Sequence, residues 1–546
     1  MVGEALATAE LVRELSRPEA YPHATPGLAV VETHISIVFL AGDFVYKVKK
    51  PLDLGFLDFR TLESRRHFCE EEVRLNARLA PDVYLGVVTI VRGPRGLRVG
   101  GPGTPLEFAV RMKRLPAEAT LLARLQRGQL DAALLTRVAH RLARFHAEAA
   151  AGEEIDAYGA LVVVARNARE NFEQTRLHIG HTVHGEVHER ARDRSEEWLQ
   201  ALGDLIEARA RAGVPRDTHG DLHLQHIYVL EDQAPPGDLA IIDCIEFNAR
   251  FRFADPVADM AFLTMDLVFR GRADLAEHFV REYFTARDDP EGEYLLPFYL
   301  AYRALVRAKV EGILALSPDA ADATRSAARL RARAYWLLAL GALEAPEGRP
   351  CLILVGGLPG TGKSTLARLL AEAVDLSPIS SDRTRKRLAG LAPDQSAAAE
   401  FGEGIYAAEW SERTYQACLT DATALLERGG RVVVDASFRE ERWRRAFLDR
   451  AEELAVPALF LHCQASTEVV RYRIMARRGD VSDADWSIHE AAAARWERLT
   501  DHTERVAQGV PTDGTPEQVL ALALRQLRQR GLAAQPGAST VAPPSA

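Results

Sequence analysis

The sequence is poor in cysteine and methionine and has no excess of basic residues. Its five cysteines are scattered, odd in number and never arranged as a CxxC pair. This usage argues against a disulfide framework and favours reduced thiols in a cytoplasmic protein. The formal net charge is -9, so we expect no general nucleic-acid binding, although a local basic groove stays open.

Long hydrophobic runs are also missing. No segment approaches the roughly 20 consecutive apolar residues that span a bilayer. Residues 1–22 lack a basic start followed by an apolar core. We therefore expect neither a membrane segment nor a signal peptide.

The chain is nevertheless long and rich in core-forming residues. With 546 residues, 47% of them apolar, it exceeds what one hydrophobic core usually organises. The segment 342–350, "ALEAPEGRP", is punctuated by Pro and Gly and separates a helical stretch from an apolar strand. We predict domains at 1–341 and 351–532, joined by this linker. The tail 533–546, rich in Pro, Ala and Ser, is predicted to be disordered.

The two halves differ in their secondary-structure rhythm. In the first half, a predicted hairpin of "AVVETHISIVFLAG" and "DFVYKVKK" is followed mainly by helical patterns. Strands first and helices later indicate a small sheet lobe and a larger helical lobe. The second half alternates apolar strands with helices, which is typical of a parallel sheet covered by helices.

The strongest motif lies in the second half. "GLPGTGKS", residues 357–364, matches GxxxxGK[ST] between an apolar strand and a helix. Its glycines let backbone N–H groups surround phosphate oxygens, and the helix N-terminus adds favourable partial charge. Lys363 is predicted to reach the β- and γ-phosphates, and the Ser364 hydroxyl to bind Mg²⁺. The predicted nucleotide-binding residues of the loop are Gly357, Gly360, Thr361, Gly362, Lys363, Ser364 and Thr365.

Further polar residues follow the strands of this half. Asp435 ends "RVVVDAS" and is predicted to hold Mg²⁺, directly or through water. Asp382, in "SSDRTRKRL", is a candidate catalytic residue that orients or deprotonates the acceptor hydroxyl, with a helix cap as the alternative. Arg473 and Arg477 share a helix face. They form either a lid over the transferred phosphoryl group or a solvated basic face.

Residues of about 351–500 resemble the P-loop kinase group that includes gluconate-kinase-like, zeta-toxin-like and polynucleotide-kinase-like proteins. The resemblance rests on "GGLPGTGKSTLA", "SSDRTRK", "VVVDASF" and the Arg-rich segment ending in "SDAD". It implies ATP-dependent transfer to a small acceptor rather than a mechanical ATPase.

In the first half, "HGDLHLQHIYV", residues 219–229, surrounds Asp221 with three histidines. Three imidazoles on a helix could bind zinc, but a glycine and the β-like "IYVL" disfavour a helix here. As a catalytic loop of the form H-x-D-x-x-x-x-N, the stretch makes Asp221 the base. His226 then occupies the position of a metal-binding Asn, although Mg²⁺ prefers oxygen ligands.

The other parts of a phosphoryl-transfer site follow in chain order. Lys47, in "DFVYKVKK", is the candidate phosphate lysine, and Lys49 points to the same side of the strand. Glu71 or Glu72 would pair with it, and we take Glu72. Asp243, after the apolar strand of "LAIIDCIEF", is the candidate metal ligand.

Residues of about 25–320 resemble the aminoglycoside-phosphotransferase-like (choline-kinase-like) branch of the protein-kinase fold. The resemblance rests on "VYKVKK", "LARFH", "HGDLH", "IIDCIEFN" and "ADPVADMAFL". It implies that Asp221 is the catalytic base, Asp243 the metal ligand and Lys47 the phosphate lysine. It also implies that residues 111–116 form a hinge that holds adenine, and that His219 and His223 brace the loop.

Both halves together resemble bacterial two-module proteins described as bifunctional aminoglycoside phosphotransferase/ATP-binding proteins. The expected fold is an N-terminal α+β bilobal protein-kinase-like domain followed by a C-terminal α/β P-loop domain. We expect ATP and Mg²⁺ at two sites that phosphorylate hydroxylated small molecules. One alternative is a single P-loop kinase regulated by a ligand-sensing, pseudokinase-like N-terminal domain. Another is a non-enzymatic, nucleotide-dependent interaction protein. The sequence indicates neither the acceptor nor the oligomeric state.

Overall fold

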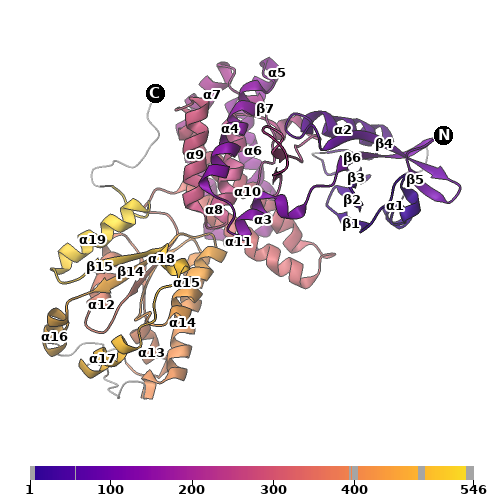
Figure 1. Cartoon of the computed structure of the whole chain (residues 1–546). Helices are drawn as coiled ribbons and strands as arrows, with labels where there is room; N and C mark the ends of the chain where they lie inside the picture. Colours follow the sequence, from indigo (N-terminus) through magenta and orange to yellow (C-terminus); the bar gives the residue numbers. More distant parts are fainter. Residues whose placement is uncertain (1–6, 56, 393–394, 396–403, 477–485, 536–546) are drawn as a thin grey trace. The chain divides into compact units, whose positions relative to one another are not determined.

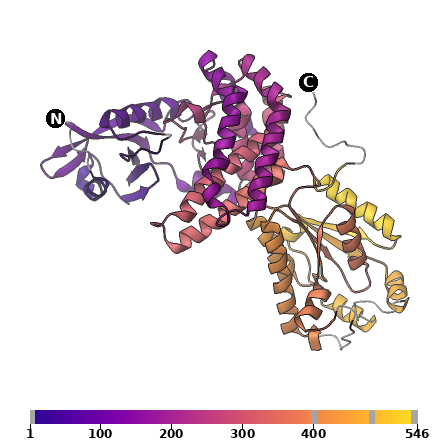
Figure 2. The ribbon, with the colours of Figure 1, turned by 180° about the vertical axis from the view of Figure 1, so that it is seen from behind.

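The computed structural model describes residues 7–55, 57–392, 395, 404–476 and 486–535. The chain divides into two compact units (Figures 1 and 2). Unit 1 comprises Met1–Val164, Leu205–Leu267 and Arg272–Leu296, and unit 2 comprises Ala165–Asp204, Val268–Gly271 and Pro297–Ala546. Among the described helices, none is both long enough and apolar enough to cross a membrane.

Unit 1 begins with a six-stranded antiparallel sheet in the order β1-β2-β3-β6-β4-β5. The predicted hairpin is present, but its first stretch forms two strands rather than one. The Thr33 hydroxyl accepts a hydrogen bond from the Ser36 N–H (2.9 Å) and closes a turn between them. The strands are β1 (Ala29–Glu32), β2 (Ser36–Ala41), β3 (Phe44–Lys49), β4 (Tyr84–Gly93), β5 (Gly96–Val99) and β6 (Pro105–Lys113).

Helix α2 (Leu62–Asn76) covers one face of this sheet and packs against β6 and β4. Thr61 caps its N-terminus by accepting a hydrogen bond from the Ser64 N–H (3.0 Å). Cys69 of the helix packs with Val110 and Met112 of β6 in a buried apolar cluster. The other face of the sheet packs with helix α1 (Thr8–Leu15) in a second apolar cluster. The sheet and α2 therefore form a fixed base for the side chains of β3.

The rest of unit 1 is mainly helical. Helix α4 packs along α9. Two short antiparallel strand pairs, β7 with β10 and β8 with β9, lie in the stretch of chain that precedes α8. The loops beside these pairs carry the polar residues of the site. The helices are α3 (Leu121–Gln126), α4 (Ala132–Glu148), α5 (Glu153–Gly159), α8 (Pro256–Phe269) and α9 (Ala273–Arg287). The strands are β7 (Arg216–Asp217), β8 (Ile227–Val229), β9 (Leu239–Ile241) and β10 (Phe253–Ala254).

Unit 2 contains a five-stranded parallel sheet in the order β12-β13-β11-β14-β15. Helices α12 and α19 pack together on one face, where Leu366, Leu370 and Leu527 join a buried apolar cluster. Helices α14 and α15 pack together and α14 contacts β13. The strands are β11 (Cys351–Gly356), β12 (Ser377–Ser380), β13 (Arg431–Asp435), β14 (Ala458–Gln464) and β15 (Ala507–Pro511).

The remaining helices of unit 2 include both segments before the linker and segments of the P-loop part. Those that begin before residue 351 are α6 (Leu161–Gln174), α7 (Gly185–Arg211), α10 (Leu296–Leu316) and α11 (Asp322–Leu343). Those that follow are α12 (Lys363–Ala373), α13 (Ser381–Leu388), α14 (Ala408–Glu427), α15 (Glu441–Glu453), α16 (Thr467–Ala476), α17 (Trp486–Ala494), α18 (Asp501–Glu504) and α19 (Pro516–Gln529).

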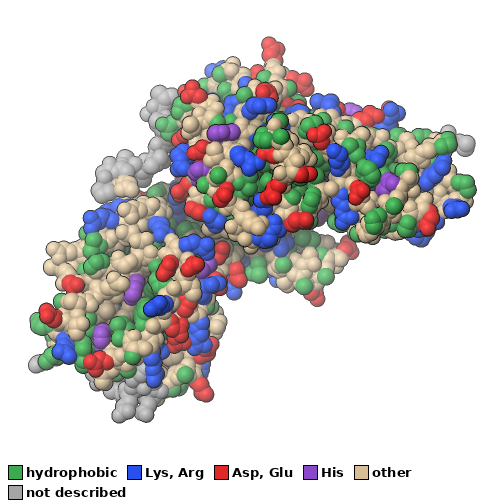
Figure 3. Space-filling model, in the orientation of Figure 1, with side chains coloured by type: hydrophobic (Ala, Val, Ile, Leu, Met, Phe, Trp, Pro, Cys, Tyr) green, Lys and Arg blue, Asp and Glu red, His purple; other side chains and the backbone are tan. Residues whose placement is uncertain are grey.

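The predicted tail lies largely beyond the part of the chain that the structure describes. Its first residue, Ala533, is buried with the preceding Leu532 in the apolar cluster of the P-loop part, and residues 536–546 lie outside the described residues. On the face shown in Figure 3, acidic and basic side chains are interspersed. This mixture matches the modest net charge of the sequence.

Candidate functional site

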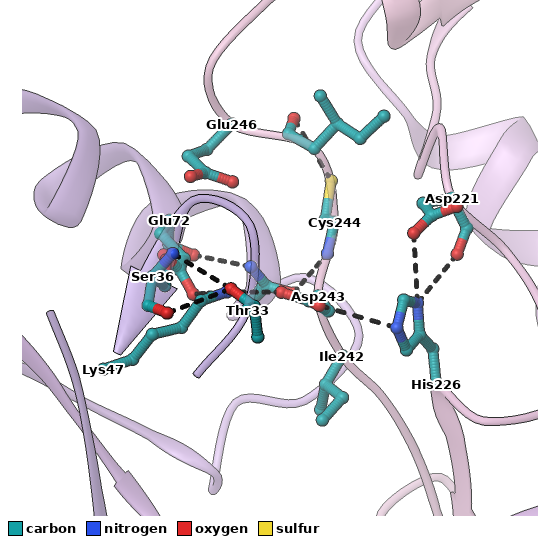
Figure 4. A network of polar contacts seen from close by, with 12 residues as sticks. Thr33, Ser36, Lys47, Glu72, Asp221, His226, Ile242, Asp243, Cys244 and Glu246 are labelled. Atoms are coloured by element: carbon teal, nitrogen blue, oxygen red, sulfur yellow. Dashed lines mark hydrogen bonds and ion pairs between the residues drawn. The ribbon is translucent and has the colours of Figure 1, made fainter. Parts of the chain in front are cut away.

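A chain of ion pairs joins three separate elements of unit 1 (Figure 4). The Lys47 Nζ of β3 lies 2.9 Å from Glu72 Oε1 of α2 and 2.6 Å from Asp243 Oδ1, which follows β9. These three residues are the predicted phosphate lysine, its partner and the predicted metal ligand. Glu71, the other candidate partner, instead forms an ion pair with Arg74 (2.7 Å) on the helix surface.

Lys49 lies behind this chain. Its Nζ is 2.8 Å from Glu72 Oε2 and also pairs with Glu246. The Lys49 side chain has no exposed surface, whereas the Lys47 side chain is 14% exposed. Lys47 is therefore the lysine that a ligand can reach, and Lys49 fixes the two glutamates. Glu246 was not predicted from the sequence, where its only signal is a second carboxylate three residues after Asp243 in "IIDCIEF".

The opposed charges keep this cluster ionised. Burial by itself lowers the pKa of Lys47, but Asp243 and Glu72 raise it overall, well above its usual value. Loss of water by itself raises the pKa of the Asp243 carboxyl, but Lys47 and His226 hold it well below its usual range. Glu72 follows the same pattern, with its pKa lowered by the two lysines against the effect of burial.

Asp243 has an uncommon backbone conformation that aims its carboxylate. Strand β9 ends at Ile241, and Asp243 lies beyond it with φ of 66°, in the left-handed region. Its N–H donates to the Tyr84 hydroxyl (3.1 Å), and the next N–H, of Cys244, donates to Asn76 Oδ1 (2.9 Å). Side chains of β4 and α2 thus hold this turn in place.

The backbone of the loop that carries Asp221 is hydrogen-bonded to a buried carboxylate. Asp259 of α8 accepts the N–H groups of His219 (3.0 Å) and Gly220 (2.8 Å), and it also lies 3.1 Å from His146 Nε2 of α4. Gly220 has φ of 86°, and a Cβ there would lie 2.9 Å from the Phe251 carbonyl oxygen. A side chain at Gly220 would therefore displace the loop. Asp259 and His146 were not singled out from the sequence, although both lie within stretches that carry the resemblance.

The three histidines of this loop have different surroundings. His219 uses both ring nitrogens, with Nε2 2.9 Å from the Ile242 carbonyl oxygen and Nδ1 3.3 Å from the Asp221 N–H. His223 Nε2 lies 3.6 Å from Asp221 Oδ2. A zinc site of all three histidines therefore does not form. Single ligand atoms of Asp221, His223 and His226 do lie within 4.8 Å of one another.

His226 lies between the two candidate carboxylates (Figure 4). Its Nδ1 is 2.9 Å from the Asp221 carbonyl oxygen, and its Nε2 is 3.5 Å from Asp243 Oδ2. Burial, together with the neighbouring His223, lowers the pKa of His226 to about 4. The ring is therefore neutral at neutral pH, with one protonated nitrogen and one that can accept or bind a metal.

In unit 2, the P-loop lies between β11 and α12, as predicted. Gly357 has φ of 151°, Gly360 of 87° and Gly362 of 86°. A Cβ at Gly357 would lie 2.7 Å from the Cys463 carbonyl oxygen, and one at Gly360 would lie 2.8 Å from a Val470 methyl carbon. The glycines are thus required by backbone conformation and by close neighbours.

The predicted carboxylate lies next to this loop. Asp435 ends β13, which lies beside β11 in the sheet, and its carboxylate lies close enough to Lys363 and Ser364 for both to lower its pKa. Burial raises its pKa, against the effects of Lys363 and Ser364. Asp435 Oδ1 is buried and has no hydrogen-bond partner among the described residues. A buried carboxylate oxygen beside a hydroxyl fits a hard ion such as Mg²⁺. Thr365, one residue further, is exposed.

Two further predicted residues lie near the P-loop. Arg473 of α16 donates to the Thr512 carbonyl oxygen (2.6 Å), while its buried Nη1 has no hydrogen-bond partner in the described part of the chain. A Cβ at Gly362 would lie 3.4 Å from this Nη1, which places the guanidinium over the loop. Arg477 lies outside the described residues.

Asp382 lies in the first turn of α13 and accepts a hydrogen bond from Arg385 (3.0 Å). The N-cap residue of this helix is Ser380, and no side chain caps it. The Asp382 charge also contributes to raising the pKa of Asp435. Asp382 is therefore not the N-cap of this helix, and its charge acts on Asp435.

Comparisons with known proteins place the chain in a family. A family model described as an AAA domain matches residues 352–506. The uncharacterized protein Rv2004c of Mycobacterium tuberculosis is 36% identical over 470 residues, which cover 86% of this chain and 90% of that protein. The chain belongs to the family of this mycobacterial protein. The uncharacterized protein Mb2027c of Mycobacterium bovis, another member, matches with the same identity and coverage.

Solved structures match each part of the chain at low identity. A gluconokinase from Sinorhizobium meliloti is 19% identical and covers 33% of this chain and 94% of its own, with a TM-score of 0.26. A choline/ethanolamine kinase family protein from Mesorhizobium loti is 14% identical and covers 61% and 97%, with a TM-score of 0.36. Aminoglycoside 2'-phosphotransferase-IIIa in its GDP complex is 17% identical and covers 60% and 97%, with a TM-score of 0.37.

The predicted fold class is confirmed. The N-terminal part has the bilobal α+β architecture of a protein-kinase-like fold, with an antiparallel sheet followed by helices. The C-terminal part is an α/β P-loop fold with a parallel sheet, and it coincides with the matched AAA family.

Proposed function

We propose that the chain is an ATP-dependent phosphotransferase with two nucleotide sites, each transferring phosphate to a hydroxyl group of a small molecule. The observation that carries the proposal is the position of Lys47, which links Glu72 and Asp243. His226 in turn lies between Asp243 and Asp221. Positioning and charge stabilisation supply most of the catalysis of phosphoryl transfer, and this cluster provides both.

In the first site, Lys47 binds the α- and β-phosphates, and Glu72 holds its ammonium in place. Asp221 accepts the proton of the acceptor hydroxyl as the hydroxyl oxygen attacks the γ-phosphorus and the bond from this phosphorus to the β–γ bridging oxygen breaks, so that ADP leaves. Asp243 and His226 would hold a metal ion, which would supply positive charge opposite the phosphates. The predicted domain 1–341 is assigned to this site.

In the second site, the P-loop backbone and Lys363 bind the phosphates, while Ser364 and Asp435 hold Mg²⁺. Asp382 orients the acceptor hydroxyl and takes its proton. Arg473, with Arg477, stabilises the charge of the transferred phosphoryl group. The predicted domain 351–532 is assigned to this site. We also propose that the protein is located in the reducing cytoplasm. Its five cysteines are free and buried, which is compatible with this location.

The test uses full-length protein, γ-labelled ATP and a library of hydroxylated metabolites. Lys363→Ala is expected to remove one class of labelled product and Asp221→Asn a second class. Loss of the base alone should slow its transfer by about 10²–10⁴-fold. The proposal is wrong if neither change alters any ATP consumption by the protein.

One observation favours a second candidate function, a single P-loop kinase regulated by unit 1. His226 stands where an oxygen ligand is expected, and a site with a poor Mg²⁺ ligand could bind nucleotide without transfer. In that case Asp221→Asn leaves all turnover intact, whereas Lys47→Ala shifts the rate at the P-loop site. The same assay therefore separates the two candidates.

A further inference from the structure

The hydrogen bonds of His226 fix the orientation of its ring. Its Nδ1 lies 2.9 Å from the main-chain carbonyl oxygen of Asp221. A carbonyl oxygen can only accept, so Nδ1 must carry the proton. In the neutral ring, Nε2 then has a free lone pair, and this lone pair faces Asp243 Oδ2 at 3.5 Å.

The facing atom is also an acceptor. The Asp243 carboxylate uses Oδ1 for Lys47 (2.6 Å) and turns Oδ2 toward His226. Two acceptors facing one another are stabilised by a cation between them. Two ligands about 2.1 Å from one ion, at a tetrahedral angle, are roughly 3.5 Å apart, which is the spacing found here.

The neighbouring cluster of Asp221, His223 and His226 is a poorer site. The His226 nitrogen that faces the Asp221 carboxylate is Nδ1, 3.7 Å from Oδ2, and that nitrogen is engaged with the Asp221 carbonyl oxygen. His223 Nδ1 accepts the N–H of Gln225 (3.3 Å), so its Nε2 carries the proton that faces Asp221. Neither ring thus offers a lone pair to this cluster.

The chemistry of the remaining pair selects the ion. Imidazole nitrogen is a borderline ligand that suits first-row transition metals, while Mg²⁺ favours oxygen alone. We propose that the unit 1 site holds a divalent transition-metal ion, through His226 Nε2 and Asp243 Oδ2, in preference to Mg²⁺. Mn²⁺, Co²⁺ and Zn²⁺ belong to this class. The inference rests on the proposed nucleotide site and specifies its metal.

The two sites of the chain would then differ in metal preference. Near the P-loop, the candidate ligands are the Asp435 carboxylate and the Ser364 hydroxyl, which are oxygen atoms only. Mg²⁺ is expected there. A single preparation should therefore show both preferences.

The test is pulsed electron paramagnetic resonance on full-length protein labelled with [15N]histidine, using Mn²⁺ and ADP as probes. The label separates histidine nitrogen from the adenine nitrogens of the nucleotide. We expect a 15N coupling to Mn²⁺ in the wild type and its loss in His226→Asn. The matched control is His223→Asn, which changes the adjacent ring of the same loop and should keep the coupling.

Calorimetry provides the second readout. Loss of an outer-shell partner of a metal commonly weakens binding by 10–100-fold, and loss of a ligand nitrogen should cost at least as much, so His226→Asn should lower the affinity for Mn²⁺ relative to Mg²⁺ by at least about tenfold. Circular dichroism checks that the variant is folded. If His226→Asn does not fold, His226→Gln takes its place, because it also removes the imidazole.

Three outcomes would overturn the inference. They are absence of the 15N coupling in the wild type, its survival in the folded His226 variant, and its loss in His223→Asn alone. None of these depends on phosphate transfer. Coupling in a protein that transfers nothing would refute the proposed function alone, and Mg²⁺-dependent transfer without coupling would refute the metal assignment alone.

Discussion

At the residue scale, two lysines of one strand have separate tasks. Lys49 is fully buried between Glu72 and Glu246, so its removal leaves two buried carboxylates without their shared cation. Removing one partner of a buried ion pair typically costs about 3–5 kcal/mol. We predict this loss for Lys49→Met, measured by urea denaturation of the full-length protein.

The matched variant is Lys47→Met, two residues earlier on the same strand. Lys47 is partly exposed, and Glu72 keeps its bond to Lys49 when Lys47 is lost. We predict a smaller loss of stability and complete loss of the transfer assigned to unit 1. Equal destabilisation by both changes, with transfer kept in Lys47→Met, would contradict this division.

The residues that could be predicted from the sequence are those that lie within a recognisable local motif. Lys47, Glu72, Asp221 and Asp243 each stood within a motif of the expected residue type, and the structure brings Lys47, Glu72 and Asp243 into contact. Asp259 could not be found in this way. Its role is to accept two N–H groups from a loop about 40 residues away, and only the packing of α8 beneath that loop reveals it.

At the scale of elements, helix α2 has a side-chain cap at its N-terminus and carries a residue of the site near its other end. Thr61 caps the helix, and Glu72 in its third turn pairs with both lysines of β3. Loss of a Thr cap costs about 1 kcal/mol. We predict that Thr61→Ala lowers the free energy of unfolding by this amount, while Thr61→Ser, which keeps the accepting oxygen, leaves it nearly unchanged.

Thermal and urea unfolding of both Thr61 variants would check this prediction. Because Glu72 lies far from the cap, the transfer rate of folded Thr61→Ala protein should stay close to that of the wild type. An equal loss of stability in Thr61→Ser would show that packing of the Thr61 methyl group, rather than capping, stabilises the helix.

Element prediction from the sequence succeeded where hydrophobic periodicity was strong and failed where it was weak. The β2–β3 hairpin and the strand before the P-loop both have regular apolar patterns, and both are present. Strand β15, "AQGVP", was missed because Gly and Pro are rare in strands. Its parallel pairing with β14 stabilises the strand, although its own residues have a low preference for strands.

At the scale of the whole molecule, the segment predicted as a linker makes specific contacts with the P-loop part. The Arg431 side chain, at the start of β13, donates to the carbonyl oxygens of Pro346 (2.7 Å) and Arg349 (3.0 Å). Arg431 is largely buried, and β13 ends at Asp435 beside the P-loop. Residues 342–350 thus help to hold the strand that carries the predicted metal ligand.

A comparison of two fragments tests this role. A fragment of residues 342–546 keeps both carbonyl acceptors of Arg431, whereas a fragment of residues 351–546 loses them and leaves a buried guanidinium N–H group unpaired. Hydrogen bonds to charged groups contribute about 1.5–3 kcal/mol each. For a unit of this size, we predict a melting temperature roughly 5–10 °C lower for the shorter fragment.

The control is Arg431→Met in the longer fragment. Since this change removes the guanidinium that needs the two carbonyls, it should bring the melting temperatures of the long and short fragments closer together. Equal melting temperatures for the two unmodified fragments would show that residues 342–350 act only as a tether. A difference that persists in full when both carry Met at position 431 would assign the stabilisation to other contacts of this segment, such as the bond from Arg349 Nη1 to the Gly531 carbonyl oxygen (3.4 Å).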